Sequence, residues 1–181
     1  MNGNKHTIVA LVEDRPGVLN RIVSKWRQRG FNIESLAVGH SEHDGLSRMT
    51  FVVDTANTDV TQVVKQLDKL IDVIHISDIT DQDMVYRELA LIKVSATPQN
   101  RSEIIQIVDI FRANIVDVDR DSLIVEATGT EDKIDAIIEL LRGFGVLEMM
   151  RTGRVAMLRG PRLTAPVEEA VEANSTPEIA L

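Results

Sequence analysis

Apolar positions in the first eighty residues alternate between strand-like runs and helical spacing. The run Thr7–Val12 is continuous and rich in β-branched residues, which predicts a buried strand. From Val18 to Trp26 the apolar residues recur at helical spacing, and Gly30, after a basic last turn, is expected to end that helix. The same criteria predict strands over Phe31–Gly39 and Leu46–Asp54, a helix from Val60 through Ile71, and a strand over Val73–Ile79. This βαββαβ order is typical of the ferredoxin-like fold, in which the helices lie on one face of a four-stranded antiparallel sheet.

The same order then repeats in the second half of the chain. The predicted elements are a strand over Leu89–Ala96, a helix over Ile104–Phe111, hairpin strands over Ile115–Val118 and Leu123–Ala127, a helix over Ile134–Leu141 and a strand over Val146–Met150. A local echo supports the repeat, since Asn32-Ile33 and Asn114-Ile115 each follow a first helix and open a second strand. We therefore expect an α+β protein with two tandem ferredoxin-like βαββαβ domains and antiparallel sheets.

The domain boundaries follow from changes in composition. The first domain is expected over residues 1–81 and the second over residues 82–160, with the short polar segment Asp81–Met84 at the junction. Residues 161–181 contain too few large apolar side chains to order themselves, so we expect a disordered tail there.

Composition narrows the classes of function. The chain has 28 acidic and 20 basic residues, a net charge of -8, which repels phosphate backbones and anionic membranes. Aromatic residues make up only 3% of the chain, so few side chains could stack on nucleic-acid bases. Nucleic acid is therefore not expected as a partner. Cysteine is absent, which excludes disulfides and thiolate chemistry. No leader or membrane-length apolar run is found, so we expect a cytoplasmic protein without a membrane partner.

The usual signatures of catalysis and metal binding are missing. The sequence has no nucleophile turn of the G-x-S-x-G type, and Gly17 lacks the further glycines or lysine of a phosphate-binding loop. The acidic run Asp117–Asp121 lacks the glycine and glutamate of a calcium loop, and its side chains are expected on a strand and turn. Four histidines show no metal-ligand spacing: His6, His40, His43 and His75. We predict no catalytic residue and no metal ligand.

The turn from Asp14 to Leu19 is the candidate binding site. A helix that begins at Gly17 leaves backbone N–H groups unpaired at the positive end of its dipole, which suits a small carboxylate. The alternative is a purely structural turn, in which Pro16 and Gly17 set the backbone angles and Asp14 caps the helix. Taken by themselves, these residues favour the structural turn.

Three stretches together closely resemble the small, regulatory subunit of acetolactate synthase (acetohydroxyacid synthase). They are Glu13–Leu19 (EDRPGVL), Arg29–Leu36 (RGFNIESL) and Leu46–Thr50 (LSRMT), and the similarity spans roughly Lys5 to Gly160. The first stretch alone is a general mark of ACT domains, which bind amino acids. The resemblance implies a non-catalytic protein that activates a separate large subunit and confers feedback inhibition, usually by valine. It also implies no cofactor in this chain, with thiamine diphosphate, Mg and FAD expected in the catalytic partner.

The resemblance further implies where the effector binds. In the family, two N-terminal ACT domains pair side by side, and the amino acid lies at their interface between a glycine turn and a second-strand asparagine. The N–H groups at the turn would hold the effector carboxylate, and Asp14, where many members have asparagine, would face its ammonium group. The turn Thr97–Arg101 of the second domain has no glycine and is not expected to bind an amino acid in this manner. The expected effector residues are Asp14, Arg15, Pro16, Gly17, Val18, Leu19, Asn32 and Ile33.

Other classes of function remain as alternatives. One is a free-standing ACT protein that binds an amino acid and regulates another enzyme or transcription, although no helix-turn-helix segment or basic patch supports a regulator of transcription. Another is an enzyme on a ferredoxin-like scaffold that uses Glu13 and Asp14 as paired carboxylates, but no recognisable motif positions a substrate for them.

Overall fold

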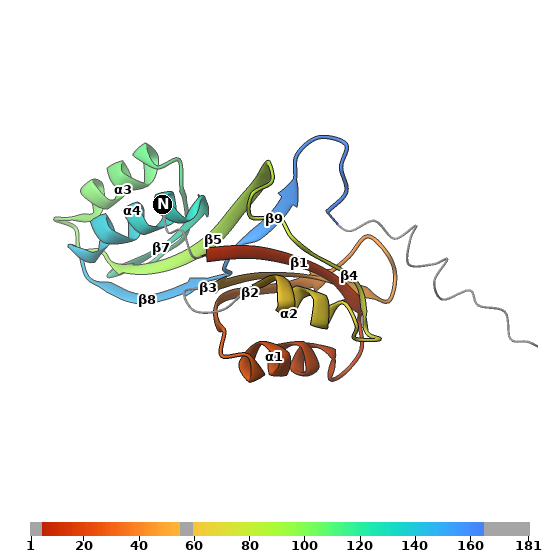
Figure 1. Ribbon diagram of the computed structural model, residues 1–181. Helices are drawn as coiled ribbons and strands as arrows, with labels where there is room; N and C mark the ends of the chain where they lie inside the picture. The colour runs from red at the N-terminus through yellow and green to blue at the C-terminus, as the bar shows by residue number, and fades with distance from the viewer. Residues whose placement is uncertain (1–4, 55–59, 165–181) are drawn as a thin grey trace, which may run out of the picture. The chain divides into compact units, whose positions relative to one another are not determined.

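The chain forms two compact units. The computed structural model describes residues 5–54 and 60–164. The first unit contains the described residues up to Val85 together with the returning segment from Ala156, and the second runs from Tyr86 to Val155 (Figure 1). Each unit has its own sheet and its own hydrophobic core.

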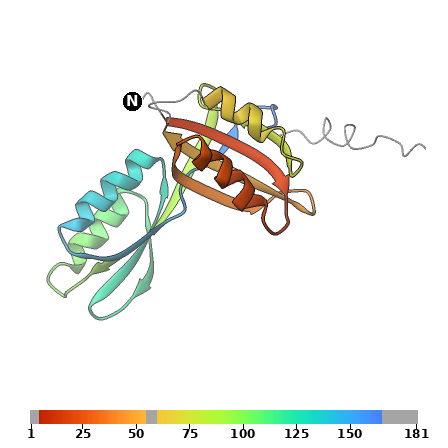
Figure 2. The ribbon, with the colours of Figure 1, turned by 60° about the horizontal axis from the view of Figure 1, so that its bottom comes forward.

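The first unit is a four-stranded antiparallel sheet with two helices on one face (Figure 2). The strand order is β2-β3-β1-β4, so β1 is central and β2 is an edge. Its elements are β1 (Lys5–Glu13), α1 (Val18–Gln28), β2 (Asn32–His40), β3 (Leu46–Asp54), α2 (Val60–Leu67) and β4 (Val73–Asp78). The predicted βαββαβ order is confirmed for this half of the chain.

The core of the first unit forms where α1 and α2 pack on β1 and β3. All residues from Ile8 to Val12 are fully buried, because β1 is covered on both faces. Trp26 of α1 is also fully buried and meets Phe31 edge-on, with ring centroids 5.4 Å apart. Gly30 ends α1 with φ +74°, and the N–H of Phe31 reaches back to the carbonyl of Trp26. The predicted helix stop at Gly30 is therefore confirmed.

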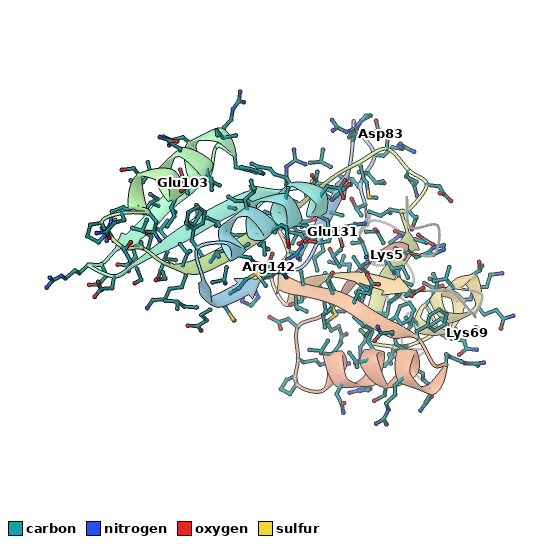
Figure 3. All side chains as sticks on the ribbon, turned by 90° about the vertical axis from the view of Figure 1, so that its left-hand side faces the viewer. Lys5, Lys69, Asp83, Glu103, Glu131 and Arg142 are labelled. Atoms are coloured by element: carbon teal, nitrogen blue, oxygen red, sulfur yellow. The ribbon has the colours of Figure 1, made fainter. Side chains whose placement is uncertain are left out.

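The second unit repeats the same plan. Its strand order is β6-β7-β5-β8, and a separate core joins the sheet to α3 and α4. Figure 3 shows the side chains, with Glu103 labelled on α3 and Glu131 and Arg142 labelled at the two ends of α4. The elements are β5 (Met84–Ser95), α3 (Arg101–Ile110), β6 (Asn114–Val118), β7 (Ser122–Gly129), α4 (Glu131–Arg142) and β8 (Val146–Arg151). The predicted α+β architecture of two ferredoxin-like halves is confirmed.

Two element boundaries differ by four or more residues from those predicted, and one strand was not predicted. Helix α2 ends at Leu67 rather than Ile71, because a turn in which Leu70 donates to the Leu67 carbonyl leads into β4 and leaves Ile71 80% exposed. Strand β5 begins at Met84, five residues before the predicted start. A further short strand, β9 (Val155–Leu158), pairs with β5 and was not predicted, since four residues carry too little alternation to stand out.

The segment after β9 returns to the first unit. The N–H of Arg159 donates to the Asp83 carbonyl, and the N–H of Leu158 donates to the Thr164 hydroxyl. Ser77 of β4 donates to the Thr164 carbonyl, and Thr164 is 6% exposed. Residues 161–164 are thus held against the first unit, whereas the rest of the expected tail, residues 165–181, lies outside the described residues.

Because the two cores are separate, core substitutions are expected to act on one unit each. Ile22→Ala on α1 and Ile137→Ala on α4 remove the same side chain from fully buried sites and should each cost about 2–5 kcal/mol. Trp26, the sole tryptophan, reports on the first unit. In urea titrations we expect Ile22→Ala to lower the midpoint of the tryptophan fluorescence transition and Ile137→Ala to leave it in place while lowering that of far-UV circular dichroism. Equal shifts of the fluorescence midpoint in both variants would contradict separate cores.

Candidate functional site at the β1–α1 turn

The turn between β1 and α1 opens the first helix without a side-chain cap. Gly17 is the N-cap residue with φ +90°, a left-handed conformation that a residue with a Cβ adopts only under strain. The interpretation of Asp14 as the helix cap is therefore wrong, because no side chain bonds to this helix end. The Asp14 carboxylate instead lies 3.1 Å from the His40 ring at the end of β2.

Backbone N–H groups at the turn are available for a ligand. The first regular helical bond runs from Arg21 N–H to the Gly17 carbonyl at 3.0 Å, and Val18 N–H makes only a long contact of 3.4 Å to the Arg15 carbonyl. Among the hydrogen bonds of the described residues, none is donated by the N–H of Gly17 or Leu19. Such groups at the positive end of a helix dipole attract an anion such as a carboxylate.

The side chains of the turn divide into exposed and buried ones. Asp14, Arg15 and Pro16 are exposed, and nothing lies within 4 Å of where a Cβ of Gly17 would be, so the turn faces open space. Val18 is 2% exposed and belongs to the first core, so only its backbone faces the turn. Leu19 is 40% exposed and places apolar surface beside the N–H groups.

Two neighbouring connections fix the turn from either side. The N–H of Asp14 donates to the Gly45 carbonyl in the β2–β3 hairpin at 2.8 Å, and the N–H of Glu13 donates to the Asp72 carbonyl at 2.9 Å. The Asp72 carboxylate also meets the guanidinium of Arg15 at 2.7 Å. Sequence reasoning missed Asp72, because it lies 57 positions from Arg15 and no local pattern links the two.

The β2–β3 hairpin beside the turn carries its own charge pair. Arg48 donates to Glu42 at 2.7 Å. A backbone hydrogen bond, followed by the bond from Arg48, holds the pKa of the Glu42 carboxyl below its usual range. Glu42 therefore stays ionised near neutral pH and contributes negative charge two positions from His40.

Asn32 and Ile33 lie at the opposite end of the sheet from the turn. In the sheet register Asn32 pairs with Asp54, and Asp54 pairs with Lys5 at the start of β1, whereas the turn follows the end of β1. The nine residues of β1 span about 26 Å at 3.3 Å per residue. Within one copy the structure thus brings Asp14–Leu19 together and places Asn32 with Ile33, but it keeps the two groups apart.

Ile33, one of the expected effector residues, and the neighbouring Leu36 lie partly in the core. Ile33 and Leu36 of β2 are half-buried and pack against the first core from its edge. Asn32 is exposed, so its amide is available at the edge of the sheet. These side chains therefore present only part of their surface to a ligand or a neighbouring chain.

Side chains of the corresponding turn in the second unit make hydrogen bonds to nearby backbone groups. The Asn100 amide oxygen accepts from the N–H of Thr97 at 2.7 Å. Arg101 donates to the carbonyls of Asp119 and Arg120 at 2.7 and 2.6 Å. No side chain caps the start of α3, and the expectation that this turn holds no amino acid in the manner of Gly17 stays a prediction.

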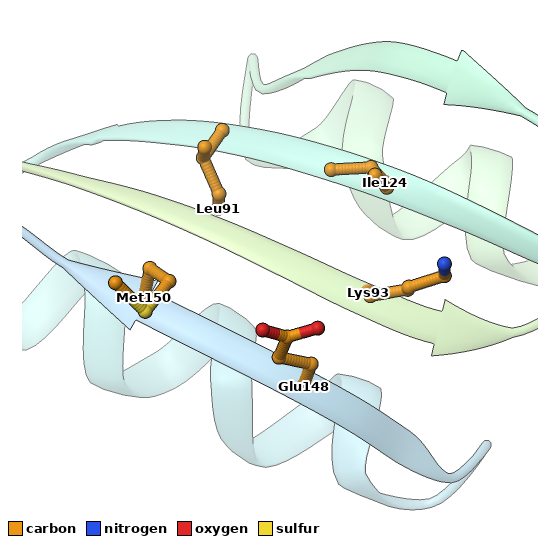
Figure 4. Close-up of a pocket in the computed structure, with 5 residues that line it drawn as sticks. All are labelled: Leu91, Lys93, Ile124, Glu148 and Met150. Carbon is orange, nitrogen blue, oxygen red and sulfur yellow. The ribbon is translucent and has the colours of Figure 1, made fainter.

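Two other features of the second unit bear on where a site could lie. A hollow of about 190 Å³ lies over the open face of its sheet, between Leu91 and Lys93 of β5, Ile124 of β7, and Glu148 and Met150 of β8 (Figure 4). Its lining is mainly apolar, and no nucleophile or histidine lies among these residues. It offers no arrangement for chemistry.

The second feature is an ion-pair cluster around Arg151, in which only Glu88 is buried. Arg151 contacts Glu88 at 2.6 Å and Asp135 at 2.7 Å. Burial alone would lower the pKa of its guanidinium, but the hydrogen bonds to Glu88 and Asp135 outweigh this and raise the pKa above its usual value. Arg151 is permanently charged, so the cluster is structural.

The described parts of the chain give no sign of a metal centre or a membrane span. Across residues 5–54 and 60–164, no three histidine or acidic side chains gather closely enough to bind a metal ion. No helix within the same ranges combines the length and apolar character that crossing a membrane would require.

Comparisons with protein families match both halves of the chain. Residues 8–75 match the family described as "AHAS small subunit-like ACT domain". Residues 87–160 match the family described as "Small subunit of acetolactate synthase". Both matches coincide with the two sheets described above.

Comparisons with individual proteins agree. The chain is 57% identical over 156 residues to a probable acetolactate synthase small subunit of Archaeoglobus fulgidus. This alignment covers 86% of this chain and 98% of that protein. It is 49% identical over 168 residues to the acetolactate synthase small subunit of Bacillus subtilis, with coverage of 92% and 98%. The crystal structure of the acetolactate synthase small subunit from Thermotoga maritima superposes with a TM-score of 0.79 at 40% identity, covering 86% of this chain and 98% of that one. On this similarity in sequence and fold, the chain belongs to the family of acetolactate synthase small subunits.

Proposed function

We propose that this chain is a non-catalytic regulatory subunit that activates the large, catalytic subunit of acetolactate synthase and makes it sensitive to feedback inhibition by valine or another branched-chain amino acid. The observation that carries the proposal is the open turn at Gly17 in an ACT domain of this family: the N–H groups of Gly17 and Leu19 have no acceptor among the described residues. Thiamine diphosphate, Mg and FAD would be held by the catalytic subunit.

The turn supplies half of the effector site. The N–H groups of Gly17 and Leu19 are suited to the carboxylate of an amino acid, and Asp14, whose side chain is 44% exposed, is suited to its ammonium group. Leu19 would contribute apolar contact to the effector side chain. Since one methylene changes binding by only about 1–3 kcal/mol, isoleucine and leucine are expected to bind as well.

A second copy of the chain would supply the other half. Strand β2 pairs only with β3, so its outer edge is unpaired among the described strands. Two such edges can pair antiparallel about a two-fold axis, as isologous dimers do. If the pairing is centred on Leu36, Asn32 of the second copy lies opposite His40, which is in contact with Asp14. Asn32 would then complete the site from across the interface, with donor and acceptor groups for the polar end of the effector.

Such an arrangement couples effector binding to assembly. An amino acid held between two copies binds the paired state more tightly than the separate state, so it shifts the equilibrium toward pairing. Coupling energies of this kind are typically about 1–3 kcal/mol. We infer that the tightened dimer presents an altered surface to the catalytic subunit, and that activation is lowered without any change to the chemical step itself.

Reconstitution tests the proposed function. The purified chain alone should show no acetolactate formation, and its addition to the cognate catalytic subunit should raise turnover. Titration of valine, isoleucine and leucine into this mixture should lower turnover again, in a saturable manner. Turnover by the chain alone, or a catalytic subunit indifferent to it, would refute the proposal.

Gly17→Asp tests the effector site. The new side chain has open space around it, but its negative charge repels the effector carboxylate. We therefore expect valine inhibition to be lost in the reconstituted assay. Gly160→Asp is the matched control, because Gly160 also has positive φ and open surroundings and the substitution adds the same charge. Full valine sensitivity in the Gly17 variant would show that the effector binds elsewhere.

Val38→Asp tests the β2 edge as the dimer interface. Val38 is 48% exposed on β2, and a two-fold pairing centred on Leu36 would set it opposite Glu34 of the second copy. Like charges directly opposite on paired strands are destabilising, so sedimentation velocity should show the variant as a monomer where the wild type is a dimer. Val155→Asp, at a valine of 51% exposure on β9, should remain dimeric. A dimeric Val38 variant would rule out this edge.

A further inference from the structure

A buried carboxylate lies directly behind the candidate effector turn. Asp72 follows α2 and precedes β4, and its side chain is only 2% exposed. Its Oδ1 accepts a hydrogen bond from Nη2 of Arg15 at 2.7 Å. Its Oδ2 lies 2.6 Å from Nη1 of Arg21, an ion pair without the alignment of a hydrogen bond. One buried anion thus binds two cations.

The two arginines stand on either side of Gly17. Arg15 precedes it in the turn, and Arg21 lies in the first turn of α1, where its N–H donates to the Gly17 carbonyl. Both arginine side chains are half-exposed, at 51% and 52%, so charged partners rather than packing hold them in place. Arg15 also pairs with Glu13 at the end of β1.

The backbone reinforces this link. The Asp72 carbonyl accepts from the N–H of Glu13 at 2.9 Å, so side chain and main chain of Asp72 both bind the segment that leads into the turn. The N–H groups of Gly17 and Leu19 have no internal acceptor among the described residues, so their direction is set only by how the turn is held. A site whose donors are fixed in advance binds more tightly than one that must be ordered by its ligand.

We propose that Asp72 is the positioning residue of the effector site: by holding Arg15 and Arg21, one on each side of Gly17, it orients the N–H groups that bind the effector carboxylate. This inference rests on the proposed function of the Gly17 turn. It also makes the α2–β4 connection part of the effector site, although none of its residues needs to touch the ligand. The chemistry recognised is that of an α-amino acid carboxylate.

Asp72→Asn tests the inference, because it keeps the size of the side chain and removes its charge. Isothermal titration calorimetry of valine into the full chain separates two effects. Loss of folded protein lowers the binding stoichiometry and leaves the Kd, whereas loss of orientation raises the Kd and leaves the stoichiometry. We expect the Kd to rise by about tenfold or more.

Glu88→Gln provides the matched control. Glu88 is a carboxylate of 6% side-chain exposure that pairs with Arg151 at 2.6 Å, but it lies in the second unit. Its substitution removes a comparable buried charge and should leave the Kd for valine unchanged. A rise in the Kd as large as that of the Asp72 variant would show that the loss of any buried carboxylate weakens binding, and it would overturn the positioning role of Asp72.

A second variant keeps the test decisive if Asp72→Asn does not fold. Arg21→Gln changes a half-exposed side chain outside the expected effector residues, leaves Asp72 paired with Arg15, and should still raise the Kd. Wild-type affinity in this variant, and in Asp72→Asn where that variant folds, would overturn the positioning role alone. A wild-type chain that binds none of valine, isoleucine and leucine would overturn the effector site and, with it, the positioning role.

Discussion

The central place of β1 in the first sheet is the constraint on which the candidate site depends. The strand is buried on both faces from Ile8 to Val12 and is hydrogen-bonded to β3 and β4 on its two sides, so it has no freedom to shift. Where it ends, at Glu13, the chain must leave the sheet and enter α1 within four residues. Only a residue that accepts a positive φ can make this entry without strain, and Gly17 does so at +90°. The open N–H groups are a consequence of that geometry.

The fold also explains why a single copy holds only half of a site. The register of β1, β3 and β2 puts Asn32 at one end of the sheet and the Gly17 turn at the other. In an antiparallel partner, β2 runs in the opposite direction, so Asn32 of the second copy lies at the end of the sheet that holds the Gly17 turn of the first. Pairing at the β2 edge is therefore the simplest way to bring Asn32 and the turn together. The same edge is unpaired among the described strands, and an unpaired edge favours association. Strand β2 would thus serve both dimer assembly and effector binding.

The two halves of the chain have one architecture and different turns. At the first turn a glycine leaves the helix end open, and charges behind it, centred on Asp72, hold the backbone. At the second turn, Asn100 accepts a hydrogen bond from the N–H of Thr97, and Arg101 donates to the Asp119 carbonyl. A repeated fold can therefore keep its sheet and core while its turns differ, because the cores depend on apolar periodicity and the turns depend on a few polar residues.

The sequence alone determined the alternation of strands and helices, the repeat of that order, the helix stop at Gly30 and the candidate turn, because each depends on residues close together along the chain. Tertiary structure decided the rest. It paired Asp72 with Arg15 across 57 positions, replaced the expected Asp14 cap with a contact to His40, and returned Thr164 to the first unit beside Ser77. Ion pairs and hydrogen bonds between residues distant in sequence depend on sheet register and chain return, and no local periodicity records these.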